Sequence, residues 1–119
     1  MTEPTPFERD LLSRFSGSVA MPGGEIWVRY EDAVAAVDLA QERGLNLLGL
    51  EGFVVGESVC PSMSRIADFS RSGYEGNAYD DARALLTGSW AEVPDDLHSE
   101  AEGLYMIDVV VDDRLRLTH

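Results

Sequence analysis

The sequence predicts one α+β domain with the β-α-β-β-α-β order of a ferredoxin-like sandwich, extended at its N-terminus by a helix and a short hairpin strand. Three observations support this prediction. The chain is 119 residues long, the length of a single domain over residues 1–119, and 45% of its residues are hydrophobic, enough for an apolar core. Its longest apolar run, Leu45 to Val55, has the character of a buried strand. Two segments with helical spacing alternate with the other strand-like segments.

The first element is predicted to be an amphipathic helix over residues 6–16. Thr5 and Glu8 have the spacing of a capping box, and Pro6 occupies the first helical position. The apolar side chains that follow recur at helical spacing, at Phe7, Leu11, Leu12 and Phe15. We expect this helix to pack on the main domain, and a helix that binds a partner is the alternative.

A hairpin is predicted next, with strands over residues 18–21 and 25–30. Pro22 followed by Gly23 suits the centre of a type II turn, because glycine accepts the positive φ that this turn requires. In the second strand, Trp27 and Arg29 are expected to point to one face and the apolar residues between them to the other.

The segment from Glu31 to Arg43 is predicted to be a helix that ends at Gly44. Acidic residues fill its first turn, and a narrow stripe of small residues lets it lie close to a sheet: Ala33, Ala36, Val37 and Ala40. A third helix is predicted to begin after Asn77, which is a good N-cap, and to stop at Gly88.

The long apolar run is predicted to be an interior strand, in which Gly49 and Gly52 mark a bulge or a close approach of two backbones. Because Pro61 has no N–H, residues 60–62 are expected to resist regular pairing, and a returning antiparallel strand is expected over Met63 to Phe69. The last strand is predicted over Leu104 to Val111, after an exposed acidic connection.

The charge excludes several classes of partner. The chain has 22 acidic and nine basic residues, for a net charge of −13. Such a charge disfavours nucleic acid, whose binding depends on basic side chains, and it disfavours anionic membrane surfaces. It favours rapid encounter with basic partners. The N-terminal residues lack the pattern of a secretory signal and no apolar run approaches a membrane span, so we expect a cytoplasmic protein.

No catalytic, metal or cofactor motif is recognisable. Cys60 is the single cysteine, and His98 and His119 are the only histidines, so neither a cysteine cluster nor a histidine-rich metal site can be built. Nucleophile elbows and glycine-rich phosphate loops are missing. We therefore predict that the protein is not an enzyme and binds no metal or cofactor.

One group of residues could form a site on the sheet face that the helices leave open. These residues combine an indole with charges of both signs: Trp27, Arg29, Glu51, Arg65 and Asp108. Opposite charges across neighbouring strands ordinarily just stabilise the sheet. A polar binding surface, or a carboxylate pair for acid–base chemistry, is the alternative.

A resemblance points to one function. The run LLGLEGFVVGESVCPSMSRIADFS follows a compact helix, and GLYMIDVVV follows an acidic stretch. In Leu47 to Phe53 and Ile66 to Ser70 above all, the sequence resembles small immunity proteins of bacterial polymorphic-toxin systems. The resemblance implies a cytosolic protein that covers the active site of a basic, nuclease-like toxin and has no catalysis of its own. It supplies no site residue.

Physical reasoning leads to a similar expectation, because carboxylates on a rigid surface can imitate a phosphate backbone and pair with a basic nuclease. We expect the partner-binding surface in the second half of the chain, at Glu75, Asp80, Asp81, Glu92, Asp95, Asp96, Glu100 and Glu102. These acids could instead be only solvated. Two other functions stay open: a small-molecule-binding domain or enzyme on the open sheet face, and a structural subunit that forms homo-oligomers through Trp27, Trp90 or a strand edge.

Overall fold

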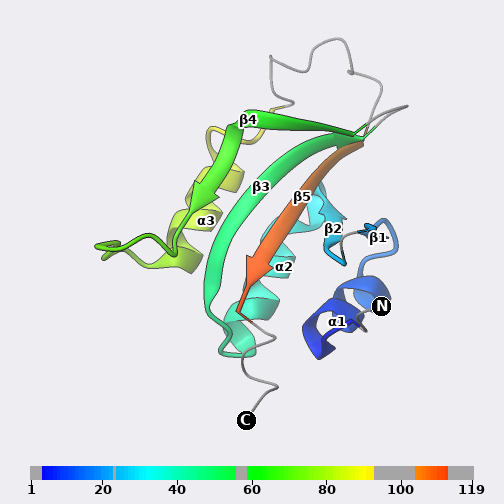
Figure 1. The fold of residues 1–119 in the computed structure, drawn as a ribbon, viewed down its shortest axis with the longest axis horizontal. Coiled ribbons are helices and arrows are strands. Elements are labelled where there is room, and N and C mark those ends of the chain that lie inside the picture. Colours follow the sequence, from blue (N-terminus) through cyan, green and yellow to red (C-terminus); the bar gives the residue numbers. More distant parts are fainter. Residues whose placement is uncertain (1–3, 23, 56–58, 93–103, 113–119) are drawn as a thin grey trace.

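A computed structural model of the chain describes residues 4–22, 24–55, 59–92 and 104–112. Within these residues the helices are α1 (Pro6–Arg14), α2 (Tyr30–Glu42) and α3 (Ala78–Thr87), and the strands are β1 (Val19–Ala20), β2 (Ile26–Arg29), β3 (Leu47–Val55), β4 (Val59–Asp68) and β5 (Leu104–Val111). The strands form one sheet with α2 and α3 behind it, while α1 lies beside the end where β1 and β2 are found (Figure 1). The predicted α+β class and order of elements are therefore confirmed.

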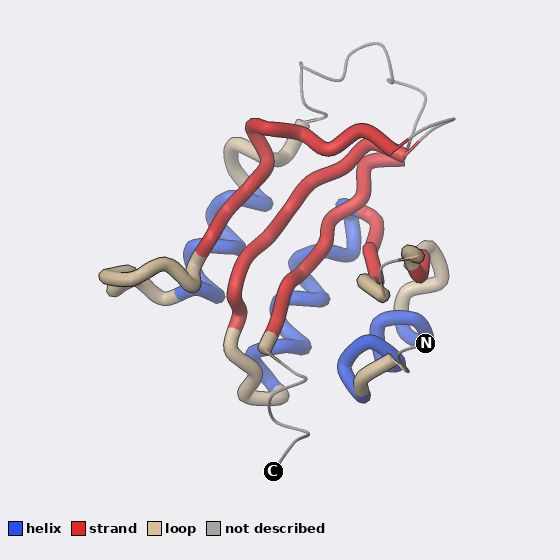
Figure 2. Tube along the Cα trace, viewed as in Figure 1, coloured by secondary structure: helices blue, strands red, loops and turns tan. Residues whose placement is uncertain are grey.

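The strand order in the sheet is β1-β2-β5-β3-β4, and every neighbouring pair is antiparallel. In Figure 2 the longer strands of this sheet, in red, lie in front of helices α2 and α3. Without the short β1, the β-α-β-β-α-β order has β2, β3, β4 and β5 as its first to fourth strands. The two strands in the middle of this sheet are β5 and β3, which are the fourth and the second. A ferredoxin-like sheet has its first and third strands there, so the predicted ferredoxin-like strand order is not confirmed.

The core lies between the sheet and helices α2 and α3. Its sheet side includes Val28, Leu50 and Ile107, all fully buried, and its helix side includes the stripe of small residues predicted on α2. Small side chains let the helix approach the sheet closely, and burial of this apolar area drives folding. As predicted, α2 ends before Gly44, whose φ of +68° favours glycine.

Helix α1 begins as its sequence predicts. The Thr5 hydroxyl accepts a hydrogen bond from the Glu8 N–H at 3.2 Å, and the Glu8 carboxylate accepts one from the Thr5 N–H at 2.9 Å. Phe7 and Leu11 are buried in the common core, so the helix packs on the domain as expected. Its first turn also brings Glu8 close to the sheet.

Strand β3 lies between β4 and β5, which confirms the predicted interior strand. The prediction for residues 60–62 is wrong: β4 begins at Val59, and Pro61 is paired opposite Phe53. The reason is that β4 is an edge strand, where proline is tolerated because one side of the strand needs no donor. The register between β3 and β4 shifts between Glu51 and Phe53, so a bulge accompanies the proline.

Gly49 is required by a close backbone approach, as its position in the apolar run predicts. A Cβ at this position would lie 2.5 Å from the carbonyl oxygen of Ala67, which is backbone on β4 and cannot rotate away. We expect Gly49→Ala to lower the free energy of unfolding by about 1–3 kcal/mol, because the two strands must separate. Urea unfolding measures the loss. Ile66→Thr, at an exposed position on the same strand pair, should change it by less than about 0.5 kcal/mol; equal losses in the two variants would contradict the explanation.

Candidate functional site

Three of the residues predicted for the open sheet face stand in one row. Trp27 on β2 is paired directly opposite Asp108 on β5, and Asp108 is paired directly opposite Glu51 on β3. Directly opposite residues of an antiparallel pair share a face. Arg29 is paired opposite Met106 and belongs to the next row of the same face. The structure therefore brings Trp27, Arg29, Glu51 and Asp108 together as the sequence predicted.

Arg65 does not belong to this group. Ile66 is paired opposite Glu51, so Ile66 points to the open face and Arg65 to the face that the helices cover. The Arg65 guanidinium donates a hydrogen bond to the backbone carbonyl of Glu92 at 3.3 Å, beyond the end of α3. The prediction failed because the bulge and Pro61 made the register of β4 impossible to assign, and a shift by one residue exchanges the two faces.

The Trp27 indole is the cover of this face. Its ring stacks on Phe53 with 3.8 Å between ring centroids, reaching across the intervening strand β5. Trp27 is only 6% exposed, and Met106 on β5, which is paired opposite Phe53, is 1% exposed. The open face is thus an aromatic surface with carboxylates beside it, and Asp108 is buried at the boundary between the two.

A cavity of about 250 Å³ opens next to Asp108. The pairing of β2 with β5 ends at Trp27 and Asp108, so the rest of that edge of β5 faces α1 without a strand partner in the described part of the chain. The cavity lies between this unpaired edge of β5 and α1. It is lined by α1, by the start of β2 and by the second half of β5: Thr5, Phe7, Glu8, Leu11, Gly24, Glu25, Ile26, Asp108, Val109, Val110 and Val111.

Asp108 has an unusual electrostatic environment. Burial raises the pKa of its carboxyl to about 7, and the neighbouring carboxylates of Glu51, Glu25 and Glu8 raise it further in that order. The Trp27 indole N–H opposes this rise, although it makes no hydrogen bond of good geometry with any described residue. No described arginine forms an ion pair with Asp108. Asp108 therefore lies among three other carboxylates and has no ion pair with any arginine that the structure describes.

The cavity was not predicted from the sequence. Glu8 is recognisable only as a capping residue of α1, and Glu25 only as a polar residue before a strand. Their approach to Asp108 depends on where α1 packs, and no local pattern encodes that. Asp108 itself carried a signal, because a charged residue interrupts an otherwise apolar strand.

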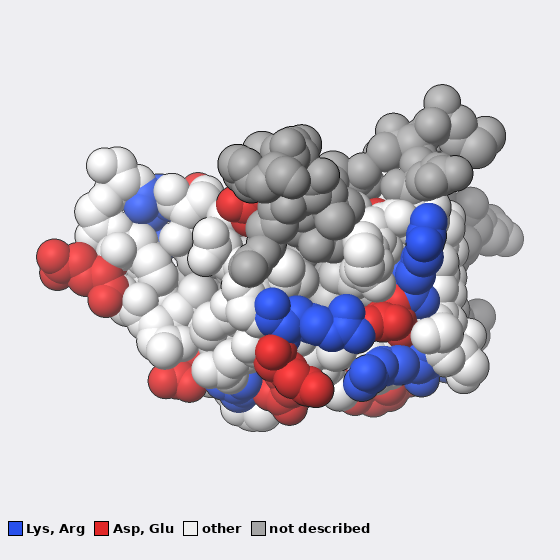
Figure 3. Space-filling model, turned by 90° about the horizontal axis from the view of Figure 1, so that it is seen from below, with Lys and Arg blue, Asp and Glu red and all other residues white. Residues whose placement is uncertain are grey.

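The predicted partner-binding surface is only partly described. Asp95, Asp96, Glu100 and Glu102 lie outside the described residues, whereas Glu75, Asp80, Asp81 and Glu92 are exposed on the described surface. Asp81 accepts a hydrogen bond from the Tyr74 hydroxyl. Burial is the main cause that raises the pKa of Tyr74 to about 12, and this hydrogen bond is the second cause. On the face shown in Figure 3, acidic side chains alternate with arginines instead of forming one continuous acidic patch.

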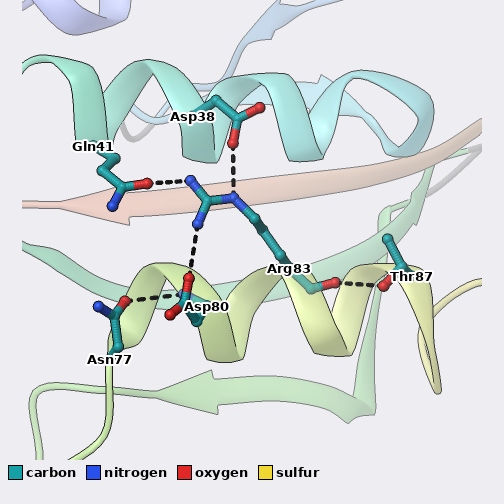
Figure 4. Close-up of polar contacts among 6 residues, drawn as sticks. All are labelled: Asp38, Gln41, Asn77, Asp80, Arg83 and Thr87. Atoms are coloured by element: carbon teal, nitrogen blue, oxygen red, sulfur yellow. Dashed lines mark hydrogen bonds and ion pairs between the residues drawn. The ribbon is translucent and has the colours of Figure 1, made fainter.

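Asp80 is held in a network that joins the two main helices. Arg83 on α3 contacts Asp38 on α2 at 2.7 Å, Asp80 at 3.2 Å and the side-chain oxygen of Gln41 (Figure 4). Asn77 caps the same helix through the Asp80 N–H at 3.0 Å. Asp80 therefore shares one guanidinium with Asp38, and its side chain stays 72% exposed.

Comparison with protein-family models, curated proteins and solved structures gives no clear match. None of these three comparisons finds a relative of the chain. No described helix has the length and apolar character needed to cross a membrane. Among the described residues, no three His, Cys, Asp or Glu side chains are placed so that they could hold a metal ion. The function of the site therefore has to be inferred from its geometry.

Proposed function

We propose that this protein is an immunity-type inhibitor: an acidic, cytoplasmic interaction protein that binds a basic, nuclease-like bacterial toxin and covers its active site. One observation carries the proposal. The carboxylates of Asp108, Glu51 and Glu25 gather beside the stacked rings of Trp27 and Phe53, without a cationic partner among the described residues.

This combination has the chemistry of a binding surface for basic protein. Interface anchors are typically aromatic side chains that are well packed and surrounded by polar groups. Carboxylates next to such an anchor pair with arginine and lysine of the partner, and a net charge of −13 speeds the encounter. Inhibition requires only that the surface bind and exclude the substrate, so the proposal needs no catalytic residue on this chain.

The proposal is tested with the product of a neighbouring toxin gene. We expect co-expression to restore growth of cells that produce the toxin, and the purified proteins to form a complex at low salt that weakens by at least about tenfold in about 0.5 M salt, because screening removes most of the charge attraction. Isothermal titration calorimetry measures the affinity. No complex at low salt would contradict the proposed function.

Charge reversals locate the surface. We expect the pair Glu25→Lys and Glu51→Lys to weaken the complex by at least about tenfold, or 1.4 kcal/mol. The matched control pair, Asp32→Lys and Glu42→Lys, makes the same change in net charge on α2 and should have a much smaller effect. If instead only Asp95→Lys, Asp96→Lys and Glu100→Lys weaken it, the surface lies in the acidic connection.

Homo-oligomerisation is a second candidate function, and one observation favours it. β4 is an edge strand whose Ile66 is 53% exposed, and an open groove runs between this edge and α3, lined in part by Phe69, Tyr74 and Leu85. An exposed edge strand can pair with another chain. Light scattering of the free protein distinguishes this function, since an inhibitor that acts alone elutes as a monomer.

A further inference from the structure

The cavity beside Asp108 has the size of a side-chain pocket. Its volume of about 250 Å³ is smaller than the roughly 300–1,000 Å³ of sites that hold drug-sized ligands or cofactors. It is bounded by apolar side chains of α1 and β2, among them Phe7, Leu11 and Ile26, and by the edge of β5. A pocket of this size with an apolar wall suits a chain of methylene groups that ends in a polar head.

The polar side chains in the cavity favour a cationic head. Glu8, Glu25 and Asp108 line it, and the lining residues that the structure describes include no arginine. Asp108 is the decisive residue because it is only 9% exposed and no described cation pairs with it. A buried carboxylate without a partner is costly, so the same place is favourable for a group that brings a positive charge.

We propose that this cavity receives the guanidinium group of one arginine side chain of the basic partner, with Asp108 as its principal acceptor and Glu25 at the entrance. The inference rests on the proposed function, because the arginine belongs to the inhibited toxin. Arginine fits better than lysine for a geometric reason. Its planar head carries five donors in fixed directions, and the carboxylates here approach from α1, from the start of β2 and from β5.

Proton release is a consequence of this assignment. The free carboxyl of Asp108 is half protonated near pH 7, because it is buried and because Glu8 from α1, Glu25 before β2 and Glu51 from β3 all face it. A guanidinium binds the ionised form and lowers the pKa of Asp108. Binding therefore releases a proton below pH 7, and the affinity decreases as the pH falls from 8 to 6.

The experiment uses N-acetyl-arginine amide as the probe and the two tryptophan indole N–H signals in the NMR spectrum as the readout. Trp27 stands directly opposite Asp108, whereas Trp90 follows α3 in the core on the other side of the sheet. We expect the Trp27 signal to shift saturably at pH 8, and the Trp90 signal to stay in place. The affinity obtained from this shift should be at least about fivefold weaker at pH 6. The shift should disappear in Asp108→Asn, and the affinity should be weaker in Glu25→Gln.

Glu75→Gln is the matched control, since it removes the same charge in the loop before α3, at the far end of the sheet from α1 (Figure 1). It should leave the Trp27 shift unchanged. The assignment is overturned if wild-type protein shows no saturable Trp27 shift, if Asp108→Asn shifts equally, if Glu75→Gln weakens the shift as much as Glu25→Gln, or if N-acetyl-lysine amide binds as tightly as the arginine probe.

The toxin complex separates the two proposals. If the toxin binds Asp108→Asn as tightly as the wild type, the proposed function stands and the arginine assignment is overturned. If the arginine probe binds at Asp108 but no toxin binds, the proposed function fails and the cavity remains a guanidinium site. If Asp108→Asn weakens the toxin complex by at least about tenfold, while the same change at the exposed Asp68 on β4 does not, both are supported.

Discussion

Asp108→Asn is expected to raise the free energy of unfolding at pH 8 by about 2–4 kcal/mol. In the folded protein the carboxyl titrates with a pKa of about 7, whereas its ordinary value is 3.8. Each unit of difference corresponds to about 1.4 kcal/mol between the two protonation states. Asparagine keeps the size of the side chain and cannot ionise, so the cost of holding a buried charge at pH 8 disappears.

The pH dependence of this effect has a definite sign. Between about pH 4 and pH 7 the folded state keeps the proton on Asp108 and the unfolded state loses it, so the folded state binds more protons and wild-type stability falls as the pH rises. Above pH 7 the full penalty is present, and below about pH 4 both states are protonated. The gain from Asp108→Asn should therefore be largest at pH 8 and close to zero at pH 4.

Urea unfolding of the two proteins at pH 4, 6 and 8 measures this difference directly. Groups far from Asp108 contribute equally to both proteins and cancel in the comparison. Glu75→Gln serves as the control, because Glu75 is exposed and its removal should change stability little at any pH. If the gain in the free energy of unfolding did not depend on pH, the charge of Asp108 would not be what destabilises the folded protein. If Asp108→Asn is more stable than the wild type but no longer binds the toxin, Asp108 serves binding at a cost in stability.

Trp27→Ala is expected to lower the free energy of unfolding by about 3–5 kcal/mol, among the largest losses from any single change in this chain. The indole is 6% exposed and stacks on Phe53 from the far side of β5, so its removal leaves a cavity across three strands. Water then reaches Asp108, and the pKa of that carboxyl should fall towards its ordinary value because burial is the main cause of its rise.

Urea unfolding gives the stability of the variant, and the carboxyl carbon signal of Asp108 gives its pKa by NMR titration. Trp27→Phe keeps an aromatic cover and is the comparison in case the alanine variant does not fold. It should lose less stability and keep most of the raised pKa. If the phenylalanine and alanine variants were equally stable, or if the Asp108 pKa stayed near 7 in Trp27→Ala, the indole would not be the cover of this site.

Much of the local structure was predictable because its signals lie within a few residues of one another. The capping box at Thr5, the small-residue stripe of α2 and the N-cap at Asn77 each depend on helical spacing, and each forms as predicted. The interior position of β3 followed from its apolar run. The error at Pro61 shows the limit, because a proline is acceptable or not according to whether its strand lies at an edge.

The sequence by itself determined the α+β class, the order of helices and strands, the net charge and the presence of one charged residue within the last strand. Only the tertiary structure decided the order of the strands, the face to which Arg65 points and the meeting of Glu8, Glu25 and Glu51 around Asp108. These features depend on pairings between residues far apart in the chain, where a register change of one residue reverses the faces. The environment of Asp108 is likewise a property of the folded sheet, because burial and neighbouring charges exist only once the strands have paired.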